Sequence, residues 1–229
     1  MNQGFTLLSD GMGYGQAWRI WKSRLNYPIF IPKELSALKT ILDEHGREAF
    51  ATELQRHARL GSVDAVAIQA YIQLRGAFGG LADAVEAVRL CSATSRTSEY
   101  LDYVWAWAYA SQTDYANALK CLQRSGQKLF PPAALDLALF VWQGWGVKEP
   151  DPKVALWFVG HAAALGHYFA PVLRSAFYRS GRLGIARKII SYLLYPLVLL
   201  RYGIAMGLNP FDARVFTINL RARRPLFSS

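Results

Sequence analysis

Hydrophobic residues recur at helical spacing along this chain from residue 32 onward. Leu35, Leu38, Ile41 and Leu42 are spaced so that a helix would place all four on one face. Three further stretches with this periodicity follow, over residues 47–60, 63–75 and about 81–91. Before residue 180, no stretch shows the alternation of apolar and polar residues that is typical of a strand. The pattern predicts an all-α chain.

Residues that begin and end helices stand at the borders of these stretches. Pro32 suits the first position of a helix, where a missing N–H costs nothing. Gly46 and Gly61 are expected to close the first and second helices, because glycine readily adopts the left-handed conformation that ends many helices. Ser62 is placed to cap the third helix with its hydroxyl group, and Gly76 is placed to end it.

Residues 96–130 are predicted to form one more helix pair. Ala106 and Ala118 are small enough to let two helices approach closely, and Leu122 fills space beside them. The prolines at 131–132 then break the run.

The spacing within this pair resembles the tetratricopeptide repeat. The residues that carry the resemblance are Ala106, Tyr109, Ala118 and Leu122. Asp102 stands where that family has a signature aromatic residue near the start of the repeat.

A set of five residues recurs with a period of 36 positions. The first copy is Ala134, Leu137, Phe140, Val141 and Gly144, and the second is Ala170, Leu173, Ala176, Phe177 and Ser180. The first copy continues to residue 166 as two antiparallel helices with their turns. A period of this length is typical of stacked helical repeats, which form extended concave surfaces.

The segment from residue 134 to 166 is similar to the SEL-one-like variant of the tetratricopeptide repeat. The resemblance is carried by Ala134, Leu137, Gly144, Gly146, Val147, Asp151, Ala155, Leu156, Phe158, Ala162, Ala163 and Gly166. The segment departs from the family at Ala138, where glycine is preferred, and at Val141, where tyrosine is usual. It also has one extra residue between Val147 and Asp151.

The resemblance implies a right-handed α-solenoid of antiparallel helix pairs, in which Gly144, Gly146 and Gly166 separate the helices. It also implies a surface that binds a protein partner. Bacterial members of this class often serve in envelope, secretion or polysaccharide machinery, and the resemblance does not choose among these.

Charge is distributed unevenly along the chain. The formal net charge is +10, yet residues 1–170 carry 16 basic and 15 acidic side chains, whereas residues 171–229 carry 10 basic and one acidic. No carboxylate side chain lies between Asp151 and Asp212. The last quarter of the chain is therefore expected to face an anionic partner.

The segment from residue 189 to 208 is apolar except for Arg201 and a few weakly polar groups. Its apolar docking residues are predicted to be Ile189, Ile190, Leu193, Leu194, Leu197 and Leu200. Twenty helical residues extend about 30 Å, enough to cross the hydrocarbon core of a bilayer. Three features argue against a membrane-spanning helix. Pro196 interrupts the middle of the segment, and basic residues lie at both ends. Placing the Arg201 side chain near the bilayer centre would cost roughly 2.5–3.5 kcal/mol.

Three arrangements of this segment stay open: a helix at the membrane interface or dipping into it, a buried helix that caps the solenoid, and a true span. For the first, the contacts with anionic lipid or an anionic partner would be made by Arg187, Lys188, Arg201, Arg214, Arg221, Arg223 and Arg224. Basic residues beside an apolar helix are expected at a phospholipid surface. Lipid is favoured over nucleic acid, because the residues beside the arginines are aliphatic and no nucleic-acid-binding fold is recognisable.

Residues 1–31 are predicted to form an arm rich in glycine and aromatic residues, with 32–182 as the solenoid and 183–229 as the docking segment. The GMGYGQA run in this arm lacks the spacing of a nucleotide-binding loop. The start of the chain has no basic residues followed by an apolar run, so we expect no secretory signal.

Candidates for catalysis or metal binding are few. Cys91 and Cys121 are expected to be buried thiols, since no CxxC motif is present. His45 and His57 lie near glutamates but do not form an HExxH motif. Most of the tryptophans and tyrosines at helical spacing are expected in the core, with one or two exposed. We expect no catalytic, cofactor-binding or metal-binding residues.

The sequence thus favours a non-enzymatic adaptor that binds a protein partner through its repeats. Its C-terminal region would dock on a membrane, or on a membrane protein complex, at the cytoplasmic face. The alternative is a soluble regulatory scaffold, in which the C-terminal helix caps the solenoid and the arginines meet an acidic protein or nucleic acid.

Overall fold

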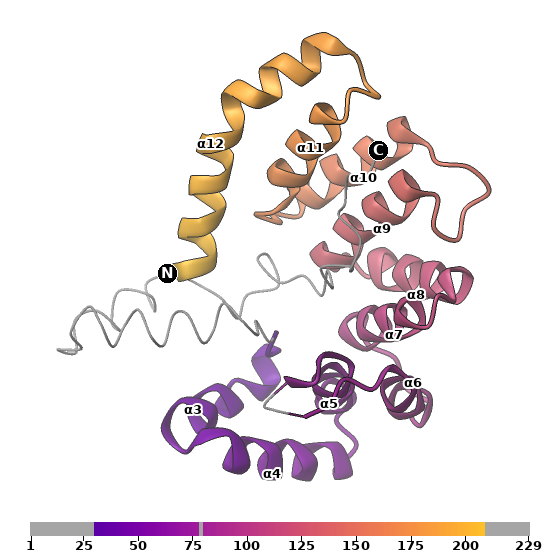
Figure 1. Ribbon diagram of the computed structural model, residues 1–229. Coiled ribbons are helices and arrows are strands. Elements are labelled where there is room, and N and C mark those ends of the chain that lie inside the picture. Colours follow the sequence, from indigo (N-terminus) through magenta and orange to yellow (C-terminus); the bar gives the residue numbers. More distant parts are fainter. Residues whose placement is uncertain (1–29, 78–79, 209–229) are drawn as a thin grey trace, which may run out of the picture.

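The computed structural model describes residues 30–77 and 80–208. All the regular elements in these ranges are helical: a short 3-10 helix η1 (Lys33–Leu35), α3 (Ala37–Glu44), α4 (Gly46–Arg59), α5 (Val63–Arg75), α6 (Ala84–Ser92), α7 (Glu99–Ser111), α8 (Tyr115–Gln127), α9 (Pro131–Gln143), α10 (Pro152–Ala164), α11 (Ala170–Arg179) and α12 (Ile185–Leu208). Each helix packs mainly on its neighbours in sequence. Figure 1 shows the helices from α3 to α11 stacked in a curved array, with α12 leading away from α11. The all-α solenoid is therefore confirmed.

Short polar side chains begin five of the helices. Ser62, Asp83, Ser98, Asp114 and Asp151 each accept a hydrogen bond from a backbone N–H in the first turn of α5, α6, α7, α8 and α10, respectively. These N–H groups have no partner within the helix itself, so each cap satisfies a donor that would otherwise need water. The predicted cap at Ser62 is among them, and Gly76 ends α5 in the left-handed conformation, as expected.

One predicted helix border differs from the structure, and two others have a second role. Gly46 takes the left-handed conformation, with φ of +81°, directly after His45, as expected for a residue that closes the first helix, and it is also the first residue of α4. The fourth helix begins after the cap residue Asp83 and not at residue 81. Pro131 and Pro132 do not only break a run, because they form the first turn of α9, where a missing N–H is tolerated.

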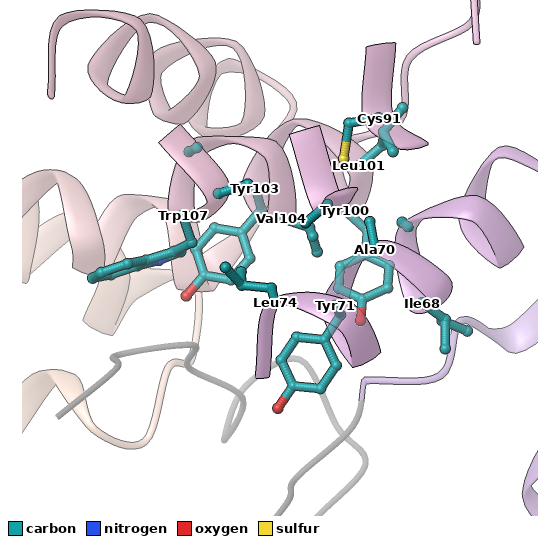
Figure 2. Close-up of a cluster of buried hydrophobic side chains, with 14 of the residues drawn as sticks. Ile68, Ala70, Tyr71, Leu74, Cys91, Tyr100, Leu101, Tyr103, Val104 and Trp107 are labelled. Carbon is teal, nitrogen blue, oxygen red and sulfur yellow. The ribbon is translucent and has the colours of Figure 1, made fainter. Parts of the chain in front are cut away.

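The core consists of two clusters of buried side chains that meet at α9. One cluster extends from η1 to α9 and the other from α9 to α11. Figure 2 shows part of the first cluster, where Tyr71 of α5 and Tyr103 and Trp107 of α7 lie among aliphatic side chains. In α9, the side chains from Pro132 to Trp142 are all buried. This helix therefore contributes to both clusters and joins them.

Asp102 is the centre of an ionic contact between α7 and α8. Its carboxylate is fully buried, and one oxygen accepts hydrogen bonds from Nε and Nη2 of Arg124 at 3.0 and 2.8 Å. The other oxygen accepts a hydrogen bond from Nζ of Lys128 at 2.9 Å. A pair of cations from α8 thus compensates the buried charge, at the position where a tetratricopeptide repeat has its aromatic residue.

Asp136 is a second buried carboxyl group, on α9. It accepts hydrogen bonds from the hydroxyl of Tyr103 and from Nε1 of Trp107, the latter at 2.8 Å, and so connects α9 to α7. Its other oxygen, Oδ1, has no hydrogen-bond partner among the described residues. Burial raises the pKa of Asp136 to about 7, although both hydrogen bonds act to lower it.

Candidate interaction surfaces

The longest helix, α12, packs on α11 through one side only. Ser191 is 2% exposed, and its carbonyl accepts a hydrogen bond from Ser175 of α11 at 3.4 Å. Farther along, the Tyr202 ring lies 4.9 Å from the ring of Phe169. Pro196 stands inside the helix, and Figure 1 shows the axis of α12 bending along its length.

The opposite side of α12 exposes a row of aliphatic side chains. The row, here called the α12 apolar face, consists of Ile185, Ile189, Leu193, Leu197, Leu200 and Ile204. Successive members lie three or four positions apart, so they follow one side of the helix. Each is between 53% and 73% exposed. Scattered exposed leucines are ordinary, but a contiguous row of this length is a candidate interaction surface.

All six predicted docking residues are exposed. Ile189, Leu193, Leu197 and Leu200 belong to the α12 apolar face, and Ile190 and Leu194 flank it, at 54% and 51% exposure. A helix that caps the solenoid by burying its apolar residues is thus only partly realised. Of the side chains described on α12, Ser191 is buried, while Tyr195, Val198 and Tyr202 are half-buried. Among the described residues, no helix is both long enough and apolar enough to cross a membrane.

Basic side chains lie at both ends of the exposed part of α12. Arg187 and Arg201 are exposed, and Lys188 is half-buried. The Arg187 guanidinium lies 5.8 Å from the ring of Tyr178. The other predicted contact residues, Arg214, Arg221, Arg223 and Arg224, lie outside the described residues. Contact of these basic side chains with lipid stays a prediction.

The three glycines predicted to separate helices all have a positive φ angle. Gly144 ends α9 with φ of +78°, and Gly166, at +81°, follows α10. Gly146, at +71°, lies against α8, since a Cβ atom there would be 2.4 Å from the carbonyl oxygen of Tyr115. In the second copy of the period Ser180 stays right-handed, and the positive φ moves one position onward, to Gly181.

One tryptophan stands out at the surface of the repeats. Trp157 on α10 is 63% exposed, and its ring stacks on that of His161 at 5.6 Å. The other described tryptophans, at positions 105, 107, 142 and 145, are buried or half-buried. The expectation of an aromatic core with an exposed ring is therefore confirmed, whereas its place on the concave face of the solenoid stays a prediction.

The polar residues considered for chemistry do not assemble. Cys91 and Cys121 are free and buried, and burial raises the pKa of both thiols. His57 lies 3.5 Å from Glu53 one turn earlier on α4. Over the described ranges, no group of three or more histidine, cysteine or acidic side chains could hold a metal ion.

Two features near α12 were not singled out from the sequence. A hollow of about 370 Å³ lies between the loop after α9 and the loop after α11, and it is lined in part by Asp151, Lys153 and Arg182. A second hollow, of about 320 Å³, lies between α11 and α12 and is lined by Ala176, Arg179, Ser180 and Tyr192. The second hollow is lined by residues of both helices, and no sequence motif indicates how α12 packs on α11.

Comparison with known proteins identifies the fold. No family model matches the sequence, and no curated protein matches it. Among solved structures, a Sel1 repeat protein from Oxalobacter formigenes matches with a TM-score of 0.53 and 18% sequence identity, over 79% of this chain and 71% of that one. The chain therefore has the fold of a SEL-one-like helical repeat protein.

Proposed function

We propose that this chain is a non-enzymatic repeat scaffold that binds a protein partner and docks through α12 on the cytoplasmic surface of a membrane. The observation that carries the proposal is the α12 apolar face. It is exposed along a helix whose other side already packs on α11. The protein partner is inferred from the repeat fold, because stacked helix pairs present extended surfaces without a built-in chemical site.

A membrane surface fits the α12 apolar face in hydrophobicity and in charge. Fully burying a leucine or isoleucine side chain contributes about 1.5–3 kcal/mol, so even partial insertion of six such side chains gives substantial binding. The stretch from residue 152 to 211 has seven basic side chains and no acidic one. Each lysine or arginine near an anionic surface adds about 1 kcal/mol. Negatively charged phospholipid is therefore the favoured surface, and a membrane protein complex offers a similar environment.

Vesicle flotation tests this function directly. The full chain is mixed with vesicles of phosphatidylcholine alone, or of phosphatidylcholine with phosphatidylglycerol, and is expected to float with the anionic vesicles. Leu193→Ser together with Leu197→Ser should abolish flotation, because both side chains belong to the α12 apolar face. The matched control, Leu60→Ser with Leu81→Ser, removes two leucines that are 71% and 91% exposed but far from α12 in sequence.

Two results would contradict membrane docking. One is a full chain that stays unbound with both kinds of vesicle. The other is a stable dimer by light scattering that the Leu193→Ser and Leu197→Ser changes convert to a monomer, since a second copy would then cover the α12 apolar face.

The second candidate function is a soluble regulatory scaffold whose C-terminal helix serves as a cap. The packing of Ser191 and Tyr202 of α12 against α11 favours it. In that case the arginines of this region would meet an acidic protein. Flotation separates the two candidates, because a cap alone gives no affinity for vesicles.

A further inference from the structure

Arg179, the last residue of α11, is held in an unusual environment. Its guanidinium carbon lies 3.6 Å from the centre of the Tyr195 ring and 6.0 Å from that of Tyr192, both on α12. Its Nε atom is buried and has no hydrogen-bond partner among the described residues. A buried charged donor without an acceptor is costly, so an acceptor supplied to this side chain would stabilise it.

The hollow beside this side chain is open to a ligand. It measures about 320 Å³ and is lined by Ala176, Arg179, Ser180 and Tyr192. This volume is at the lower end of the range for small-molecule pockets. Stacking on a tyrosine ring occupies the flat face of a guanidinium and leaves its N–H groups, which lie in its plane, free to point into such a space.

The electrostatic surroundings favour an anion. No acidic side chain exists between Asp151 and Asp212, so none in this stretch competes for Arg179. The carbonyl groups at the end of α11 would repel an anion if they were free. However, those of Ala176, Phe177 and Tyr178 accept hydrogen bonds from residues 180 and 181, which reduces this effect.

We propose that the hollow at Arg179 binds the phosphate group of an anionic phospholipid. A guanidinium matches two phosphate oxygens with two parallel hydrogen bonds, which gives geometric selectivity as well as affinity. Tyr192 lines the hollow and is itself 56% exposed on α12, one turn from Ile189 of the α12 apolar face. A phosphate in the hollow would thus place the acyl chains of its lipid beside that face. The assignment rests on the membrane docking proposed above.

The main test compares arginine substitutions on the same helix. Arg179→Gln removes the proposed phosphate ligand. Arg174→Gln removes the same charge from an exposed position one turn and a half earlier on α11. Arg179→Gln is expected to weaken binding to phosphatidylglycerol-containing vesicles about tenfold, as the loss of a charged hydrogen bond predicts. Arg174→Gln should weaken it less than twofold. Equal effects of the two substitutions would overturn the proposal, because only overall charge would then matter.

Arg179→Lys separates hydrogen-bond geometry from charge. Lysine keeps the positive charge but cannot form two parallel bonds, so this variant should lose nearly as much affinity as Arg179→Gln. Full binding by Arg179→Lys would contradict the site. Circular dichroism and thermal unfolding verify that each variant remains folded. If Arg179→Gln is destabilised, the comparison between Arg179→Lys and the native chain decides whether the site exists.

A binding assay without a bilayer keeps the two proposals distinguishable. The Nε–H resonance of Arg179 is followed by NMR while dihexanoyl phosphatidylglycerol is added below its micelle concentration, and in a separate titration while inorganic phosphate is added. A shift that saturates with the lipid supports the site even if vesicle flotation fails. A shift with inorganic phosphate alone would make the hollow a site for free phosphate and overturn the lipid assignment. No shift with either would overturn the site while leaving membrane docking through the α12 apolar face intact.

Discussion

Asp136 is a carboxyl group enclosed by the hydrophobic side chains of α7 and α9. Burial raises the pKa of Asp136 to about 7, whereas its pKa in the unfolded chain is near 3.8. The folded protein therefore binds a proton on this carboxyl group more tightly than the unfolded chain does. The contribution of Asp136 to stability is therefore complete below about pH 4 and is lost as the pH rises through 7.

Asp136→Asn should remove this pH dependence. Each unit of pKa shift corresponds to about 1.4 kcal/mol, so the free energy of unfolding of the native chain should fall by at least this amount between pH 5 and pH 8, relative to the variant. Urea unfolding followed by circular dichroism at several pH values measures this change in the free energy of unfolding. Parallel pH profiles for the two proteins would show that Asp136 is ionised in the fold.

Gly146 and Gly61 share a left-handed backbone but differ in their surroundings. A Cβ atom at Gly146 would collide with the carbonyl group of Tyr115, whereas nothing lies within 4 Å of one at Gly61. Gly61→Ala should cost about 1–2 kcal/mol through backbone strain. Gly146→Ala adds the collision and should cost about 3 kcal/mol or more. Urea unfolding of both variants measures the difference, and equal losses would mean that the loop around Gly146 adjusts freely.

At this scale the sequence was informative about conformation and not about polar partners. Ser62 and Gly76 could be placed because a cap acts within a few residues of its own helix. Asp102 and Asp136 could not, since the cations and donors that make their burial tolerable lie more than 20 positions away. Arg179 could not be placed either, because its tyrosine partners, although nearer in sequence, are on another helix.

Individual helices were predicted well wherever the hydrophobic period was combined with a nearby end signal. Gly46 and Pro131 each end one helix and begin the next, and only the path of the loop shows this second role. The start of α6 was placed too early, because the cap at Asp83 was not identified in the sequence. The role of α9 also exceeded what its sequence suggests. A single helix buried on nearly all sides joins two core clusters, and periodicity cannot show which neighbours share it.

Pro196 accounts for the bend of α12 at the scale of the element. Proline cannot donate the backbone hydrogen bond to the preceding turn, and its ring collides with the carbonyl group four residues earlier. Pro196→Ala should therefore straighten the helix. Spin labels at Ile185 and Ile204 would then lie about 29 Å apart along the axis, as expected for an unbent α-helix, and closer together in the native chain. The distance between the two spin labels is measured by electron paramagnetic resonance. An unchanged distance would mean that the packing of α12 on α11, and not Pro196, causes the bend.

For the whole molecule, the 36-residue period predicted stacked helical repeats, and the resemblance of residues 134–166 added the SEL-one-like type. Neither predicted how the core and the exposed apolar residues are distributed along the chain. The neutral part, up to residue 170, contains nearly all of the core, and the basic part contains α12. The charge asymmetry indicated that the last quarter differs from the repeats. The tertiary structure adds that apolar residues of α12, up to Ile204, are left exposed, which no periodicity could establish.

Removal of residues 184–229 tests whether this last part supports the fold or only extends it. No residue of α12 belongs to either core cluster, and the second cluster ends with Leu183. The shortened chain should therefore unfold cooperatively and keep its helical circular dichroism. Its stability should fall modestly, because Val172, Ser175 and Ala176 of α11 lose their cover. It should also lose all affinity for phosphatidylglycerol vesicles. A shortened chain that is unfolded by circular dichroism would instead establish α12 as the cap on which the solenoid depends.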